Sequence, residues 1–260
     1  LKKHTDYRYV IFAEGEQSVQ SLMASGSIGN SEVYKVGYPK MDPYFIDGNY
    51  DRNEILISLG LDPDKPTVLF APTYKPTCIY ELKDVIFRAT KDYNLIIKLH
   101  HYAWMGKYIS HRQHKIFEKR VKNYPHAVII PKDDYSILPL LYAADTLVSE
   151  ASGAITEFLA TGKTGIIYNL DQEKLKHFDG EALLSFDNRE YLKDSFVHIN
   201  STDKLRDGIK HALHPTPEMK RAQKADQDKI FFRLDGNASK RTKTKIELLL
   251  AENGNPSLSG

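Results

Sequence analysis

The sequence predicts an α/β protein built on a Rossmann-type, doubly wound parallel sheet. Two observations favour this fold class. Short apolar runs alternate along the 260-residue chain with longer amphipathic stretches, which is the order of strands and helices in such a sheet. None of the runs alternates cleanly between apolar and polar residues, and this is typical of parallel strands whose two faces are both covered.

The expected strands are eight apolar runs of four or five residues, most of them rich in Val, Ile and Leu. In chain order they are Tyr9–Phe12, Val33–Val36, Thr67–Ala71, Leu95–Leu99, Ala127–Ile130, Thr146–Ser149, Gly165–Tyr168 and Phe196–Ile199. We expect five of them to form the central strands of one sheet, namely those that contain Leu69, Ile97, Ile129, Val148 and Ile167.

The expected helices lie between these runs and after them. Within the alternating part, Asp203–Leu213 places its apolar residues on one side, as an amphipathic helix does. Beyond Pro215 the sequence is typical of helix alone. The other helices are expected over Ile137–Ala144 and Ile155–Thr161, from near Pro217, and from after Asn237 to Glu252.

A breaker-rich segment from Gly37 to Asn49 indicates a domain boundary. We therefore expect residues 1–47 to be the end of a preceding domain with its linker, and residues 48–252 to form a Rossmann-like domain with C-terminal helices. Residues 253–260 are rich in Asn, Gly, Pro and Ser and are expected to be a disordered tail. The sequence lacks an initiator Met, so we interpret it as part of a longer protein.

Composition excludes several classes of protein. The single cysteine, Cys78, allows no intrachain disulfide, which favours a reducing compartment. No apolar run approaches the ~20 residues of a spanning helix. A net charge of +2 gives no general attraction to nucleic acid. Basic residues nevertheless crowd the last predicted helix (Lys240, Arg241, Lys243 and Lys245). They form either a solvated helix face or a surface for an anionic partner, such as a phosphate polymer or acidic membrane.

Ligands of open α/β sheets bind where strands end and helices begin. The strongest such segment runs from Ser149 and Glu150 through Ser152 and Gly153 to Glu157. Unpaired N–H groups at a helix start attract anions, and a glycine lets a phosphate approach the backbone. Glu157 lies one turn further and could reach a ribose hydroxyl. The alternative is an ordinary N-cap at Ser152, with Glu157 favouring the helix dipole.

Three other segments carry candidate side chains. Thr73 follows one expected strand, while Lys98 and His100 end the next, where His100 could donate to a phosphate oxygen or protonate a leaving group. His101 is expected to point away from His100, since neighbours on an extended segment do so. Each could equally have a structural role, as could the capped turn before the last helix (Asp235, Ser239 and Arg241). No Cys, His or Asp cluster has metal-ligand spacing, so we expect no metal.

Taken in order, these segments resemble the CDP-glycerol glycerophosphotransferases of teichoic acid and capsule synthesis. The segments that carry the resemblance are Gly37–Asp42, Asp51–Leu61, Leu69–Lys75, Lys98–His100, Asp134–Ser136 with Leu138–Ala144, Ser149–Phe158 and Asp235–Arg241. The sequence departs from the family pattern at four positions. His101 replaces a proline, Glu150 and Glu157 replace aspartates, and Gly153 replaces a second serine.

The resemblance implies a GT-B-like fold of two Rossmann-like domains, of which this chain is the C-terminal domain and the end of the N-terminal one. It implies that residues 48–252 hold a CDP-alditol donor, that an acceptor hydroxyl attacks the phosphorus bearing the alditol, and that CMP leaves. His100 would be the catalytic residue. The donor-binding residues would be Thr73, Lys98, Ser149, Glu150, Ser152, Gly153, Glu157, Asp235, Ser239 and Arg241.

The resemblance further implies a glycan or polyol-phosphate acceptor, no cofactor beyond the CDP-glycerol-like donor, and no nucleic acid. The expected location is cytoplasmic, with peripheral attachment to the inner face of the cell membrane. Two alternatives remain open. One is a GT-B glycosyltransferase or sugar-nucleotide epimerase that uses a UDP-sugar, which Gly153 and Glu157 favour. The other is a non-catalytic nucleotide-binding module.

Overall fold

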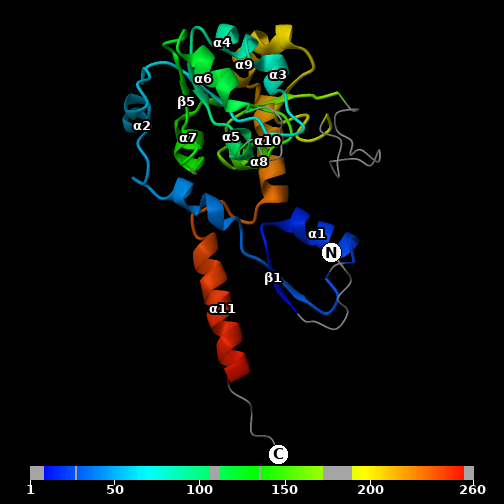
Figure 1. Cartoon of the computed structure of the whole chain (residues 1–260). Coiled ribbons are helices and arrows are strands. Elements are labelled where there is room, and N and C mark those ends of the chain that lie inside the picture. Colours follow the sequence, from blue (N-terminus) through cyan, green and yellow to red (C-terminus); the bar gives the residue numbers. More distant parts are fainter. Residues whose placement is uncertain (1–8, 27, 106–111, 135, 172–188, 255–260) are drawn as a thin grey trace, which may run out of the picture. The chain divides into compact units, whose positions relative to one another are not determined.

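The computed structural model describes residues 9–26, 28–105, 112–134, 136–171 and 189–254 (Figure 1). The predicted tail therefore lies largely outside the described residues. The elements are β1 (Val10–Ala13), α1 (Glu16–Ala24), β2 (Glu32–Lys35), η1 (Pro39–Phe45), α2 (Arg52–Ser58), β3 (Thr67–Phe70), α3 (Ile79–Leu82), α4 (Val85–Ala89), β4 (Asn94–Ile97), α5 (Tyr102–Met105), α6 (His114–Val121), β5 (Ala127–Ile129), α7 (Leu138–Ala143), β6 (Thr146–Ser149), α8 (Gly153–Ala160), β7 (Ile166–Tyr168), β8 (Val197–Ile199), η3 (Thr202–Lys204), α9 (Leu205–Leu213), α10 (Pro217–Ile230) and α11 (Ala238–Gly254). Each of the eight predicted strands is present within a residue or two of its expected position.

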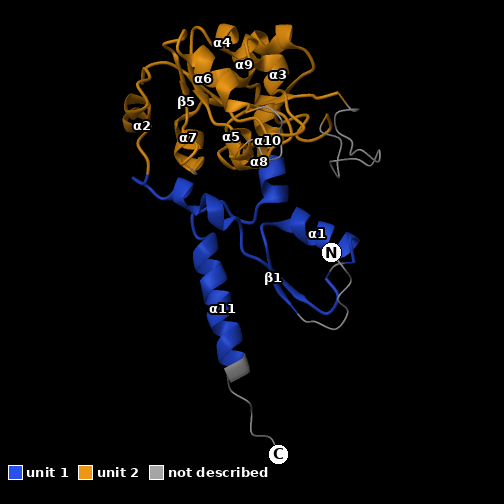
Figure 2. Cartoon of the chain, in the orientation of Figure 1, with its two compact units in different colours: residues 1–49, 225–260 blue, residues 50–224 orange. Residues whose placement is uncertain are grey.

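The chain divides into two compact units (Figure 2). One comprises residues 1–49 and 225–260, and the other comprises residues 50–224. The first boundary falls close to the predicted linker, whereas α11 and the last residues of α10 group with residues 1–49 in this division. The assignment of functional domains stays a prediction.

The larger unit contains a six-stranded sheet in the order β5-β4-β3-β6-β7-β8, and every neighbouring pair is parallel. This confirms the predicted fold class. The prediction of a central strand is wrong for Ile129, because β5 is an edge strand among the described strands. Its three residues are only half-buried. Helix α6 packs against β5. The Ala127–Ile130 run is therefore apolar because it contacts a helix, and not because β5 has a neighbouring strand on each side.

Both faces of this sheet are buried, which explains the missing alternation in the sequence. Val68, Phe70, Leu95 and Ile97 pack in one apolar cluster with residues of α3, α4, α6 and α9. Their neighbours on the opposite face, such as Leu69, are equally inaccessible to solvent. Helices α7 and α8 pack against β3 and β6. The strands therefore need apolar side chains at nearly every position.

Short sequence signals set the ends of several helices in this unit. Asp51 accepts a hydrogen bond from the Glu54 N–H at 2.9 Å and so caps α2. Gly60 and Gly162 follow α2 and α8 with φ of 71° and 73°, the left-handed conformation that glycine adopts most readily. No described helix combines the length and the apolar character that crossing a bilayer requires.

The smaller unit holds the parallel pair β1 and β2 together with α1, η1 and α11. Asp42 of η1 is buried, and its carboxylate accepts the backbone N–H groups of Ala238 and Ser239 at 2.9 and 2.6 Å. These N–H groups open α11 and have no partner inside the helix. Asp42 therefore caps α11 from 196 residues away in the sequence.

Candidate functional site

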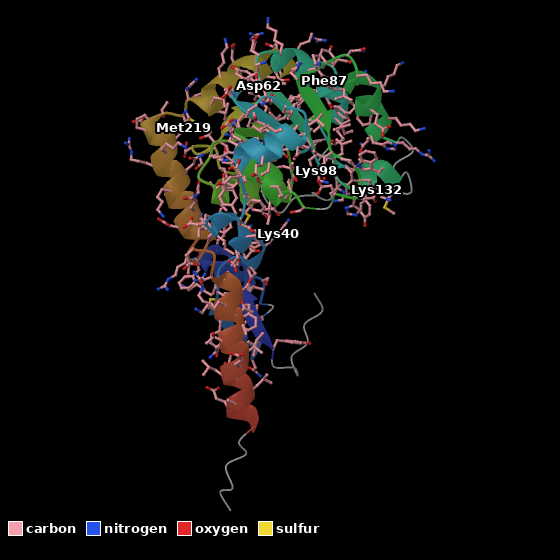
Figure 3. All side chains as sticks on the ribbon, turned by 90° about the vertical axis from the view of Figure 1, so that its left-hand side faces the viewer. Lys40, Asp62, Phe87, Lys98, Lys132 and Met219 are labelled. Carbon is pink, nitrogen blue, oxygen red and sulfur yellow. The ribbon has the colours of Figure 1, made fainter. Side chains whose placement is uncertain are left out.

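The structure brings three separate segments to one edge of the large sheet. Strands β4, β3 and β6 are adjacent and parallel, so their carboxyl ends meet at the same edge. Thr73, His100 and Ser152 follow these strands. Figure 3 shows Lys98 at this edge and Asp62 at the opposite end, where Asn94 at the start of β4 donates to the Asp62 carbonyl at 2.6 Å. Residues far apart in sequence thus follow strands that end at one edge of the sheet in the larger unit.

Helix α8 begins at this edge with a capped but open N-terminus. The Ser152 hydroxyl accepts the Ala154 N–H at 3.2 Å. Ser152 is therefore an N-cap, as expected under the alternative to an anion-binding role. The Gly153 N–H makes no hydrogen bond to any other described residue. A Cβ built on Gly153 would meet no atom within 4 Å. Packing does not require glycine here, because the space beside its Cα is open. Glu157, one turn further along, is buried.

His100 lies at the same edge and has one ring nitrogen engaged by the backbone. Its Nδ1 accepts the Tyr102 N–H at 3.2 Å, so the proton of the neutral ring lies on Nε2. Burial, and secondly the neighbouring His101, lower the pKa of His100 below its ordinary value. The ring is therefore largely neutral at pH 7, and its Nε2–H is a hydrogen-bond donor. Its centroid lies 4.9 Å from that of Tyr74.

The expectation that His101 points away from His100 is wrong. The two ring centroids lie 4.3 Å apart. Strand β4 already ends at Ile97, and the backbone then turns toward α5, with the Ala103 N–H bonded to the His100 carbonyl at 2.9 Å. The alternation of an extended chain no longer applies in such a turn. His101 is exposed, whereas His100 is half-buried.

Lys98 joins two segments of the edge. Its Nζ donates to the carbonyl of Asp134, which lies between β5 and α7. Partial burial lowers the pKa of Lys98, and the nearby Asp134 opposes this effect. Its positive charge therefore lies beside the end of β4, where an anionic ligand would benefit from it.

Ser149 and Glu150 lie beneath this surface, because both side chains are almost completely buried. Ser149 Oγ donates to the Ala71 carbonyl at 2.8 Å and links the ends of β6 and β3. Glu150 Oε1 accepts the N–H groups of Thr73 and Cys78 at 3.0 and 3.3 Å. Burial raises the pKa of Glu150 to about 8. Both residues therefore support the loops of the site from below.

The remaining predicted residues belong to the smaller unit and form contacts there. Arg241 pairs with Asp235 at 2.8 Å and donates to the Val36 carbonyl at 2.7 Å. The Ser239 N–H is held by Asp42. Gly37 is needed beside them, since a Cβ there would meet Phe232 O at 2.6 Å and the backbone has φ of 94°. These motif residues thus hold α11 against the segment that ends β2.

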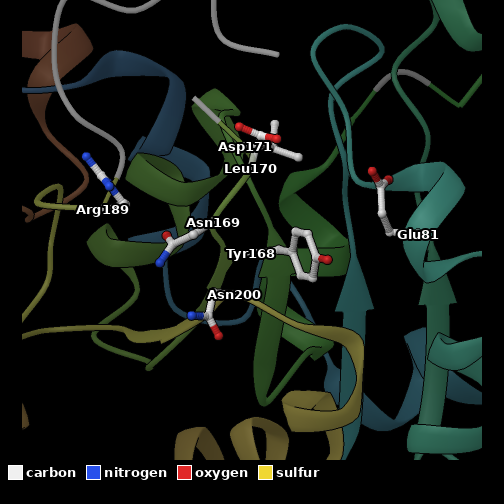
Figure 4. Close-up of a pocket in the computed structure, with 7 residues that line it drawn as sticks. All are labelled: Glu81, Tyr168, Asn169, Leu170, Asp171, Arg189 and Asn200. Carbon is white, nitrogen blue, oxygen red and sulfur yellow. The ribbon is translucent and has the colours of Figure 1, made fainter. Parts of the chain in front are cut away.

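A cavity of about 480 Å³ lies at the carboxyl ends of β7 and β8 (Figure 4). Sequence reasoning did not identify it, because its residues follow strands without forming a motif. The amide, carboxylate and guanidinium groups in its wall are those that bind hydroxyl and phosphate groups. The residues that line it are Glu81, Tyr168, Asn169, Leu170, Asp171, Arg189 and Asn200.

Two other useful residues were missed, although the sequence carried a signal for each. Tyr74 follows Thr73 in the strand-end motif, and its ring contacts His100. Asp42 closes the Gly37–Asp42 segment and caps α11. Among the described residues no group of three or more His, Cys, Asp or Glu side chains could hold a metal ion. Asp62 and Asp64 form a turn, in which Asp62 Oδ1 accepts the Asp64 N–H at 3.0 Å.

Known sequences resemble the chain over most of its length. The model of the family described as CDP-Glycerol:Poly(glycerophosphate) glycerophosphotransferase matches residues 1–248. The teichoic acid glycerol-phosphate primase of Bacillus subtilis (strain 168) is 24% identical over 176 residues, which are 65% of this chain and 42% of the primase. The chain thus spans less than half the length of this relative.

Solved structures share the fold. The wall teichoic acid polymerase TagF superposes with a TM-score of 0.68 at 18% identity, over 93% of this chain and 58% of that one. UDP-GlcNAc 2-epimerase of Neisseria meningitidis, bound to UDP-GlcNAc, gives 0.57 at 15% identity over 92% and 61%. MnaA of S. aureus with UDP gives 0.56 at 16% identity over 92% and 60%. The larger sheet is therefore GT-B-like, as the sequence predicted.

Proposed function

The chain belongs to the CDP-glycerol:poly(glycerophosphate) glycerophosphotransferase family, and from this premise we propose that it takes part in alditol-phosphate transfer. The donor is a CDP-alditol that carries glycerol or ribitol phosphate. The acceptor is a hydroxyl group of a teichoic acid or of a cell-wall or capsule glycan, and the second product is CMP.

The observation that carries this proposal is the meeting of His100 and the α8 N-terminus at one sheet edge. A diphosphate is anionic, and the open Gly153 backbone at a helix start suits one of its phosphates. His100 Nε2–H and the Lys98 ammonium add a donor and a cation. We assign the ribose to Glu157 and the diphosphate to Thr73, Ser152 and Gly153.

The reaction places particular demands on these groups. The acceptor oxygen forms a bond to the phosphorus that bears the alditol, while the bond from that phosphorus to the CMP oxygen breaks. Negative charge then builds on the leaving CMP phosphate. His100 is the group that donates a hydrogen bond or a proton to it, and the helix N-terminus stabilises the charge electrostatically. The role of Asp235, Ser239 and Arg241 as donor-binding residues stays a prediction from the family resemblance.

The second candidate function is a reaction of a UDP-sugar. An epimerase with bound UDP-GlcNAc and MnaA with bound UDP share the fold, and Gly153 stands where the glycerophosphotransferase pattern has a serine. Cytosine and uracil differ in their hydrogen-bonding edge, so a competition between CDP-alditols and UDP-sugars separates the two functions. A nucleotide-binding module without catalysis would bind one of them and release no product.

We also propose a cytoplasmic enzyme attached peripherally to the inner membrane face. Lys240 and Lys243 are exposed on α11, and Lys245 lies 4.0 Å from the ring centroid of Tyr34. A basic helix is attracted to anionic lipid and to anionic polymer. Sedimentation with phosphatidylglycerol vesicles should fall when Lys240 and Lys243 are replaced by Gln. Equal sedimentation of both proteins would show that this surface of α11 does not bind the membrane.

The test of function measures CMP release by the intact protein from CDP-glycerol and CDP-ribitol, with UDP-GlcNAc as the competing donor class. We expect CMP in the presence of a polyol-phosphate acceptor, and a loss of CMP in the His100→Ala variant. Turnover of UDP-GlcNAc without CMP release would favour the second function. Binding of CDP-glycerol without CMP release would favour a non-catalytic module.

A further inference from the structure

One buried side chain closes the loop of residues 73–78, which connects β3 to α3. Glu150 reaches this loop from the end of the neighbouring strand β6. Its Oε1 accepts the Thr73 N–H at 3.0 Å and the Cys78 N–H at 3.3 Å. A single carboxyl oxygen therefore joins the two ends of the loop. We call this arrangement the Glu150 clasp.

The surroundings of the clasp favour a neutral carboxyl group. Glu150 is 1% exposed and Cys78 is 0% exposed. Glu150 Oε2 is also buried and has no hydrogen-bond partner among the described residues. An ionised carboxylate with one bare oxygen is costly in such a place. Burial accordingly raises the pKa of Glu150 to about 8.

The described groups around the carboxyl supply no compensating positive charge. The 73–78 loop faces Glu150 with the Thr73 and Cys78 N–H groups, the Thr77 side chain and the Cys78 thiol. Glu81 on α3 adds a second carboxyl group near that thiol. No lysine or arginine is among the groups that shift the pKa of Glu150. Burial raises the pKa of this carboxyl more than the hydrogen bonds from Thr73, Thr77 and Cys78 lower it, so the carboxyl group is mostly protonated at pH 7.

The loop held by the clasp carries Tyr74, which contacts the candidate catalytic histidine. The Tyr74 ring centroid lies 4.9 Å from that of His100 and 5.0 Å from that of Tyr102. Gln113 holds the other side of the same residue by donating to the Tyr74 carbonyl at 3.1 Å. Glu150 fixes the N–H of the preceding residue. Tyr74 is thus positioned from both sides.

We propose that Glu150 is a positioning residue whose carboxyl group holds the 73–78 loop so that Tyr74 packs against His100. Glu150 does not touch the donor. It acts through the loop on the orientation and environment of the His100 ring. The role of His100 in transfer rests on the proposed function, whereas the contact between Tyr74 and His100 can be measured without a substrate.

The test compares Glu150→Gln with Glu150→Ala in the full chain. Glutamine keeps an oxygen that accepts both N–H groups, whereas alanine removes it. Lys163→Met is the structural control. Lys163 donates to three backbone carbonyls near the end of α7, at 2.7 to 3.2 Å. Loss of these hydrogen bonds should lower the stability of the fold without changing the surroundings of His100.

The first readout is the NMR signal of the His100 imidazole in protein labelled with ¹³C-histidine, assigned with a His100→Asn variant. We expect the wild-type signal in Glu150→Gln and Lys163→Met at pH 6.5, and a displaced signal in Glu150→Ala. The wild-type signal should also move between pH 7 and 9 in a second transition that Glu150→Gln lacks. An undisplaced His100 signal in Glu150→Ala, or no such difference between wild type and Glu150→Gln, would overturn the proposal.

The second readout is turnover of CDP-glycerol by the intact protein. Glu150→Ala should lower kcat by about tenfold or more with little change in KM, since a small misplacement of a catalytic group is enough for this. Glu150→Gln should restore turnover at pH 7. If the wild type does not turn over CDP-glycerol, the proposed function fails. The NMR comparison still shows whether Glu150 positions the 73–78 loop. If Glu150→Ala does not fold, the pH transition in wild type and Glu150→Gln decides it.

Discussion

Replacing Glu150 by glutamine should remove a large pH dependence from the stability of the larger unit. Burial raises the pKa of this carboxyl from its ordinary value of 4.5 to about 8. Between these two values the folded chain binds more protons than the unfolded chain, so the stability of the wild type falls as the pH rises. Below pH 4.5 and above about pH 8 the contribution is constant. Glutamine does not titrate and contributes no such slope.

The magnitude follows from the width of this pH window. One pH unit corresponds to about 1.4 kcal/mol, so the difference in unfolding free energy between Glu150→Gln and wild type should grow by roughly 3–4 kcal/mol from pH 5 to pH 8. A constant cost enters as well, because the new amide group replaces the unpartnered Oε2 and costs about 1–3 kcal/mol. This constant cancels when the difference is followed across pH.

Urea unfolding at pH 5, 6, 7 and 8 measures this difference, with the fluorescence of Trp104, the chain's single tryptophan, as the probe. Trp104 stacks on His114 within the larger unit, at a centroid distance of 4.6 Å, so its signal reports this part of the fold. The wild-type midpoint should fall toward pH 8 while that of Glu150→Gln changes much less. Parallel curves for the two proteins would show that Glu150 is ionised in the folded chain and would refute the reasoning.

Three further predictions concern Lys163, the two neighbouring histidines and the absence of a metal requirement. Lys163→Met should lower the unfolding free energy by roughly 2–4 kcal/mol, because three partly buried carbonyls lose their donor. An unchanged melting temperature would contradict this. His100→Ala in the intact protein should lower turnover by ~10²-fold, the scale of a general acid. His101→Ala should instead raise the pKa of His100, since His101 lowers it, and should change turnover far less. Equal losses in both variants would remove His100 from the mechanism. Treatment with EDTA should leave donor binding intact, and loss of binding on chelation would show that a metal ion is required.

The sheet could be predicted because burial on both faces leaves a simple pattern. Runs such as Thr67–Ala71 are apolar throughout, short, and bounded by breakers. Their order along the chain then gives a parallel sheet with helical crossovers. The order of strands within the sheet leaves no such pattern. The apolar pattern therefore predicts a central strand for Ile129, although a helix contact makes an edge strand equally apolar.

The common sheet edge of Thr73, His100 and Ser152 could be predicted because each follows a strand, whereas their role in binding a donor stays a prediction. The conformation of the backbone at each position was less predictable. His101 was misjudged because the sequence does not show that β4 stops at Ile97. The burial of Glu150 was not foreseen either, because an acidic residue beside Ser152 is typical of an exposed loop. Only the fold shows that its partners are two N–H groups of a loop 72 to 77 residues earlier.

The measurement that tests the central claim most directly is calorimetric titration of CDP-glycerol into the intact protein, its Ser152→Ala variant and an Asp51→Ala control. Both substitutions remove the N-cap of a helix in the larger unit, but only Ser152 lies at the carboxyl edge of the sheet. The account predicts that Ser152→Ala weakens binding by about 5- to 30-fold, the effect of one hydrogen bond to a charged group. Asp51→Ala should bind like wild type, and UDP-GlcNAc should bind more weakly than CDP-glycerol. Equal affinities in all three proteins would place the donor elsewhere and contradict the account.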